Sequence, residues 1–136
     1  ASDVYKRQVH LGMAYEDKLM YREALEAFQK ARALPGGNPL TTGALGHCYA
    51  VSGNKGEARK LLEELEALSA RRYVSPTSRA LVYIGLGEKD RVFLWLEKAY
   101  QEHDPWLAWL KAEPIFDSLR TDARFTQLLR KVRLLE

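Results

Sequence analysis

Two adjacent residues, His47 and Cys48, are the best placed in this chain to do chemistry, and they stand together in the stretch ALGHCYAVSG. Imidazole and thiolate groups are common zinc ligands, and the same two groups can serve as base and nucleophile. Neighbouring residues on a helix, however, point about 100° apart and cannot both hold one ion. Cys48 is also the only cysteine, so no second pair stands at zinc-finger spacing. We therefore expect no metal ion here.

The remaining candidate residues complete no catalytic pattern either. His10 and His103 are far from His47 in the sequence, and the serines lack the G-x-S-x-G setting of an activated nucleophile. No glycine-rich phosphate loop follows a strand, because the sequence predicts no strand. We expect that the chain is not an enzyme and that it has no catalytic residue, cofactor or metal ion.

The segments that would position His47 and Cys48 belong to a repeat with a period of 34 residues. Leu11, Gly12 and Tyr15 recur as Leu45, Gly46 and Tyr49, and Ala24, Phe28 and Ala31 recur as Ala58, Leu62 and Leu65. A third copy continues with Ala80, Tyr83, Val92, Leu96 and Ala99. This spacing predicts two amphipathic helices in each copy, separated by a short polar turn.

The repeat assigns a structural role to both residues of the opening pair. Cys48 aligns with the apolar residues Ala14 and Val82, so we expect it to be buried and unreactive. His47 aligns with Met13 and Leu81 on a different side of the helix. The small residue of each first helix is expected to let the second helix approach closely, with a tyrosine filling the gap beside it; these small residues are Gly12, Gly46 and Ala80.

Helix starts are predicted where a capping side chain precedes a proline, which has no N–H to leave unpaired. The pairs are Asn38-Pro39, Ser75-Pro76 and Asp104-Pro105. After Asp104 we expect one helix that ends at Pro114, a short apolar turn, and a last helix capped by Thr121.

The pattern L-G-x-x-Y, followed by A-x-x-x-F-x-x-A with a 34-residue period, resembles the tetratricopeptide repeat. The resemblance implies an all-α fold, a right-handed α-solenoid of about three helix pairs. We assign residues 9–37, 38–73 and 74–103 to the three repeats, the third being degenerate because Arg79 replaces the leucine. Residues 104–136 are assigned to a C-terminal helical cap, since a solenoid must cover its last apolar face.

The two ends of the chain carry further resemblances. The ending DPWLAWLKAEPIFDSLRTDARFTQLLRKV is similar to the close of bacterial multi-repeat tetratricopeptide proteins, whose repeats often follow an N-terminal effector domain. Residues 1–8, ASDVYKRQ, resemble the translation of a transposon-end adapter used in DNA library preparation. We expect these eight residues to be a non-native scar and the natural chain to continue upstream.

Composition restricts the function classes. Hydrophobic residues make up 46% of the chain, yet no apolar run approaches the roughly 20 residues that a membrane helix needs, so no membrane partner is expected. A single cysteine and no secretory signal favour the cytoplasm. The net charge of +3 is mild, with 21 basic and 18 acidic residues interspersed, which leaves only the basic last helix as a candidate nucleic-acid surface.

The resemblance implies a scaffold that binds a peptide or helix of another protein in a concave groove. By analogy the first-helix groove residues are Val9, Met13, Glu16, Asp17, Gly43, His47, Ala50, Val51, Thr77, Leu81 and Ile84. They predict an apolar or amphipathic partner with a basic flank. One alternative is a regulatory or self-associating C-terminal tail of a transcription regulator, kinase or cyclase. Nucleic-acid binding through the last helix is the less favoured alternative.

Overall fold

The computed structural model describes residues 2–35 and 38–132, and within these ranges it contains helices and no strand. The α-helices are α1 (Ser2–Asp17), α2 (Tyr21–Ala33), α3 (Pro39–Val51), α4 (Lys55–Ser69), α5 (Pro76–Leu86), α6 (Lys89–Gln101) and α7 (Ala123–Lys131). Two 3-10 helices, η1 (Pro105–Trp109) and η2 (Pro114–Leu119), lie between α6 and α7. The predicted all-α fold is confirmed. None of the described helices is both long and apolar enough to span a membrane.

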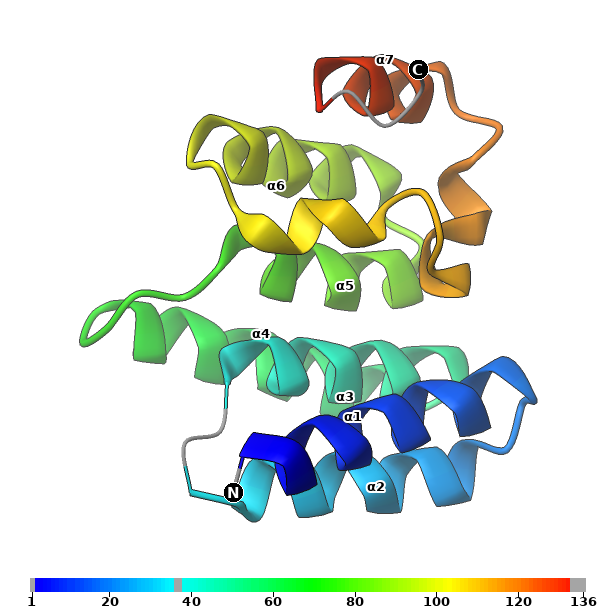
Figure 1. The fold of residues 1–136 in the computed structure, drawn as a ribbon, viewed down its shortest axis with the longest axis vertical. Coiled ribbons are helices and arrows are strands. Elements are labelled where there is room, and N and C mark those ends of the chain that lie inside the picture. Colours follow the sequence, from blue (N-terminus) through cyan, green and yellow to red (C-terminus); the bar gives the residue numbers. More distant parts are fainter. Residues whose placement is uncertain (1, 36–37, 133–136) are drawn as a thin grey trace.

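Consecutive helices form three contacting pairs, α1 with α2, α3 with α4 and α5 with α6. The pairs follow one another in chain order along the long axis of the molecule, with α7 at the far end (Figure 1). Helix α3 also packs against α2, and its most extensive contact is with α5 rather than with its own partner α4.

Glycines set the close approach of α3 and α5. A Cβ added at Gly43 would overlap the Ser78 carbonyl oxygen and lie 2.9 Å from the Ser78 Cα, and one at Gly85 would lie 2.8 Å from the Ala50 Cβ. Both distances are shorter than real Cβ contacts allow, so only glycine fits at this spacing.

The small residues of the repeat have two different roles. Gly12 faces its own second helix as predicted, because a Cβ there would meet the Phe28 ring at 2.6 Å. Gly46 does not, since a Cβ there would lie 2.7 Å from a methyl carbon of Val82 on α5. The prediction for Gly46 is therefore wrong about the partner helix, because α3 lies so close to α5.

Helix α1 begins upstream of the expected repeat boundary at residue 9. Tyr5 and Val9 continue the stripe that includes Gly12 and faces the neighbouring helices, and all three are at least half-buried. The Tyr5 hydroxyl contacts the Thr41 hydroxyl and accepts a hydrogen bond from the Asn38 N–H at 3.2 Å. Residues 2–8 are thus helical and Tyr5 joins this part of α1 to the start of α3, whereas Ala1 lies outside the described residues.

Two of the three predicted Pro-containing starts are capped by their own side chain. Asn38 accepts from the Leu40 N–H at 2.9 Å, and Asp104 accepts from the Trp106 N–H at 3.0 Å. Ser75 makes no such bond within its own helix and instead donates its hydroxyl to Asp104. Asp104 also accepts from the Thr77 hydroxyl at 2.9 Å and the Thr77 N–H at 3.3 Å. This buried carboxylate therefore caps both α5 and η1.

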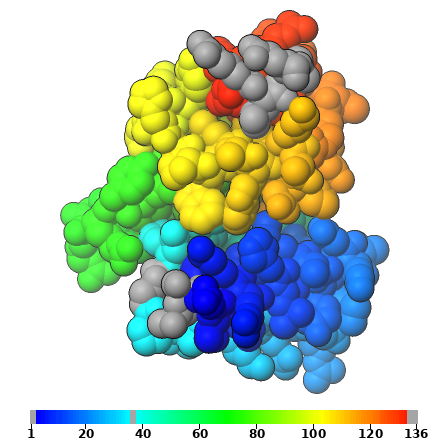
Figure 2. Space-filling view, viewed as in Figure 1, coloured from blue at the N-terminus to red at the C-terminus, as the bar shows by residue number. Residues whose placement is uncertain are grey.

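The segment after α6 returns across the molecule instead of only covering its end. η1 contacts α6, η2 contacts α5, and α7 contacts α6. From the side drawn in Figure 2 the yellow and orange atoms of this segment lie over much of α5. Its apolar side chains are buried in the same core cluster as α3 and α5 residues; they are Leu107, Leu110, Phe116, Leu119, Phe125, Leu128 and Leu129.

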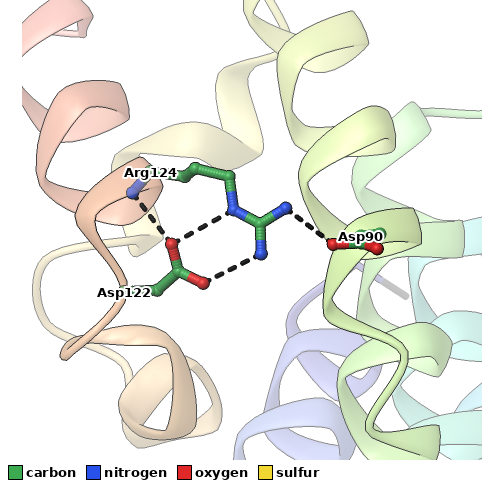
Figure 3. A network of polar contacts seen from close by, with 3 residues as sticks. All are labelled: Asp90, Asp122 and Arg124. Atoms are coloured by element: carbon green, nitrogen blue, oxygen red, sulfur yellow. Dashed lines mark hydrogen bonds and ion pairs between the residues drawn. The ribbon is translucent and has the colours of Figure 1, made fainter.

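The last helix is capped by Asp122 and not, as predicted, by Thr121. The Asp122 carboxylate accepts from the Arg124 N–H at 2.9 Å, and it also holds the Arg124 side chain. Arg124 reaches Asp90 of α6 at 2.9 Å, so one guanidinium joins the two helices (Figure 3). A hydroxyl at Thr121 cannot replace this bidentate carboxylate, and the helix begins one residue later.

Candidate functional site

The predicted groove residues do not share one open surface. Seven of them are buried, and five of these face other helices rather than the hollow: Val9, Gly43, Ala50, Thr77 and Leu81. Met13 is half-buried and packs on the core. The other five line a single hollow: Glu16, Asp17, His47, Val51 and Ile84. The prediction of a continuous groove is wrong for the first set.

Close helix packing explains the burial of this first set. Gly43 and Ala50 face α5 across the glycine-mediated contact, where no space remains for a ligand. Thr77 is bound to Asp104, and Leu81 lies in the core cluster that the returning C-terminal segment completes. The repeat pattern placed these residues on one helix face correctly, but that face is covered by the chain itself.

The remaining hollow has a volume of about 340 Å³ and lies where α1, α3 and α5 end. Its fourth side is η2, which the sequence pattern did not connect with the groove. The complete lining is Glu16, Asp17, Leu19, Tyr21, His47, Val51, Ile84, Pro114, Ile115, Asp117 and Ser118. This volume lies within the range of small-ligand and side-chain pockets, about 300 to 1,000 Å³.

Two apolar side chains at the hollow, Leu19 and Val51, are exposed. Leu19 exposes 71% of its surface and has a φ of 62°, in the left-handed region that a leucine rarely adopts. Val51, at the end of α3, exposes 39%. Ile84 and Ile115 add apolar surface from α5 and η2. Burial of this aliphatic surface against a ligand would therefore be favourable.

The hollow is also acidic. Glu16, Asp17 and Asp117 line it, and Asp117 forms an ion pair with Arg120 at 2.7 Å. Among the described residues no cation forms an ion pair with Asp17. Partial burial, followed by repulsion from Glu16 and Asp117, raises the pKa of the Asp17 carboxyl above its ordinary value. A cation placed here would relieve this repulsion.

Glu16 lies close to both His47 and Cys48. Its carboxylate contacts His47 Nδ1, without hydrogen-bond geometry, and lies beside the Cys48 thiol. Cys48 is fully buried, as predicted, and burial and the Glu16 charge raise the pKa of its thiol. A thiol held protonated is a poor nucleophile and a poor metal ligand. Within the described ranges no three His, Cys, Asp or Glu side chains are placed to hold a metal ion.

A carboxylate against an imidazole is also part of a hydrolytic triad, and Ser118 lines the same hollow. No hydrogen bond joins His47 to Ser118 in the described part of the chain. In this part of the chain the hollow therefore holds no hydrogen-bonded pair of nucleophile and base.

Three of the four basic residues described between positions 120 and 131 form ion pairs within the molecule, whereas Arg130, exposed on α7, forms none in the described structure. Arg120 donates to the Leu110 and Glu113 carbonyl oxygens as well as to Asp117, and Lys131 pairs with Glu97 at 3.0 Å. Arg124 is shared by Asp90 and Asp122 (Figure 3). Arg133 lies outside the described residues. These pairs reduce the positive charge that α7 offers to a phosphate backbone.

Known proteins supply no assignment for this arrangement. No protein-family model matches the chain, and neither a curated protein nor a solved structure matches it.

Proposed function

We propose that the chain is a tetratricopeptide-like α-solenoid module that binds a short segment of another protein, and that the binding site is the acidic hollow at the ends of α1, α3 and α5. The segment carries an aliphatic side chain next to a lysine or arginine. The observation that carries the proposal is the combination, in one hollow, of exposed aliphatic side chains and three carboxylates.

The helical framework supports the solenoid part of this proposal. Three contacting helix pairs follow one another in chain order, and first helices α3 and α5 lie side by side. The 34-residue register of the sequence matches this succession. Among the predicted groove residues that the structure describes, the exposed ones gather at the hollow, which favours a short segment as the partner.

The chemistry of the hollow defines the segment. An aliphatic side chain of the partner would be desolvated against Leu19, Val51 and Ile115, and this contact provides most of the affinity. A neighbouring cation would lie near Asp17, which lacks an ion-pair partner in the described structure, and would provide specificity and association rate. A peptide of this composition can dock in an extended or helical conformation.

Selection from a random peptide library on the purified chain tests the proposal. The expected sequences pair an aliphatic residue with a lysine or arginine. Binding of a selected peptide should weaken about tenfold or more in Asp17→Lys, because attraction becomes repulsion at the same place. The matched control is Glu26→Lys, which makes the same charge change at an exposed position of α2.

The apolar contact is tested separately. Val51→Ser should weaken the same peptide about tenfold, whereas Leu94→Ser, at an exposed aliphatic residue of α6, should not. Selected peptides without basic residues, or equal affinities for Asp17→Lys and Glu26→Lys, would contradict the proposal. The self-association predicted as an alternative would appear as a concentration-dependent mass in sedimentation that Asp17→Lys lowers.

A further inference from the structure

A second hollow has the opposite charge balance and lies between the end of α4, the start of α5 and the second half of α6. It has a volume of about 400 Å³ and includes Arg72, Arg79 and Lys98 in its lining, with Trp95 beside them. The end of α4 and the loop after it, green in Figures 1 and 2, project from the molecule and form one wall. This hollow shares no residue with the acidic one.

Arg79 stands where the other two repeats have a leucine, Leu11 or Leu45. In the structure its guanidinium carbon lies 4.4 Å from the centre of the Trp95 ring, and its Nη2 donates to the Ser69 hydroxyl at 2.9 Å. The stacked ring and the hydroxyl fix the orientation of the planar guanidinium. An apolar repeat position has thus been replaced by a positioned cation.

Arg79 also lacks the counter-ion that comparable arginines have. Three arginines in the described ranges are half-buried, and two of them pair with a carboxylate, Arg32 with Glu64 and Arg120 with Asp117. No carboxylate lies within ion-pair distance of Arg79 among the residues that the structure describes. Because this guanidinium is partly desolvated and has no counter-ion, it would bind an anion favourably.

The other charges of the hollow favour an incoming anion. Lys98 Nζ lies 5.1 Å from the centre of the Trp95 ring, and neither Lys98 nor Arg72 forms an ion pair in the described structure. Of the two carboxylates in the lining, Glu102 accepts a hydrogen bond from the Tyr73 hydroxyl at 3.0 Å. Glu66, the other, is exposed at the edge.

We propose that this hollow binds a phosphoryl group, held by Arg79 with Lys98 and Arg72. The three cations come from three different segments, α5, α6 and the loop after α4, so they approach a ligand from different directions. This suits a tetrahedral group with three acceptor oxygens and nearly two negative charges better than a planar carboxylate. The source is either a free phosphomonoester or a phosphorylated side chain.

Titration of the intact chain with inorganic phosphate and phenyl phosphate, followed by the NMR signal of the Trp95 indole N–H, tests the site. Both probes should give saturable shifts. Arg79→Gln should weaken binding about tenfold or more, and Lys98→Gln by several-fold, about the effect of losing charged hydrogen bonds. Arg71→Gln, at an exposed neighbouring arginine outside the hollow, should change the affinity by less than about twofold.

Thermal unfolding of each variant shows whether it is still folded. This control is needed because Arg79 packs on Trp95, so its replacement could also affect folding. If Arg79→Gln fails to fold, the phosphate affinities of Lys98→Gln and Arg71→Gln are compared instead. Lys98 is exposed, so its replacement should leave the fold intact. The absence of a saturable shift, equal weakening by Arg71→Gln, or equal affinity for acetate and phosphate would overturn the proposal. A phosphoserine peptide that binds more tightly than phenyl phosphate assigns the protein source, and the reverse assigns the small-molecule source.

Discussion

Replacing Gly43 by alanine tests the close packing of α3 on α5, and we expect it to destabilise the protein. The new Cβ would overlap the Ser78 carbonyl oxygen and lie 2.9 Å from the Ser78 Cα, whereas ordinary contact begins at 3.4 Å, so the helices must move apart. Overpacking typically costs about 1 to 3 kcal/mol, and the upper value applies because backbone atoms cannot swing away. Alanine returns about 1 kcal/mol of helix propensity, leaving a net loss of about 2 kcal/mol.

The matched control is Gly56→Ala in α4, where no atom lies within 4 Å of the new Cβ. Only the propensity gain remains there, and it is smaller than in a helix interior because Gly56 is the second residue of α4, so Gly56→Ala should stabilise the protein by about 0.5 kcal/mol. Urea unfolding measures both, and with a slope of about 2 kcal/mol/M the midpoint of Gly43→Ala should fall by about 1 M. If both variants shift the midpoint upward, α3 and α5 are not in the contact described.

Three further results are expected. In the native protein Cys48 should react with a thiol reagent far more slowly than in the unfolded chain, because burial raises the pKa of its thiol; equal rates would place it at the surface. Asp17→Asn should be more stable than the parent at pH 7, since a raised pKa penalises the folded carboxylate, and the difference should vanish well below pH 3.8; a difference independent of pH would exclude this cause. Asp104→Ala should lower the free energy of unfolding by about 3 kcal/mol, because buried donors lose their acceptor; an unchanged urea midpoint would contradict the shared cap.

Local sequence signals predicted the helices well. The repeat spacing and the capping residues Asn38 and Asp104 act through neighbours within a few positions, so the pattern alone identifies them. Cys48 and the aligned Val82 are both buried, whereas Ala14, the aligned residue of the first repeat, is exposed. The resemblance of residues 1–8 to an adapter predicts no structural role for them, whereas Tyr5 belongs to α1 and contacts Thr41 of α3.

The site was not predictable in the same way, because tertiary contacts decide which helix faces stay open. The periodicity places Gly43 and Leu81 on one face, but it does not indicate that α5 and the C-terminal segment cover that face. Asp117 and Ile115 reach the hollow from a 3-10 helix without periodic pattern. The contact of Glu16 with His47 joins two repeats at a spacing that no motif specifies.

The returning C-terminal segment also changes how this chain should unfold. In a linear repeat array each unit touches only its neighbours, so an end can fray while the rest stays folded. Here Asp117 of η2 and Asp17 of α1, 100 positions apart in the sequence, line one hollow, and Asp104 caps both α5 and η1. Loss of the last segment therefore removes contacts and a helix cap from the third pair, and it also opens the hollow that the first pair helps to line. Native-state hydrogen exchange should accordingly report the core amides of α3, α5 and η2 opening as one cooperative unit, with a common free energy.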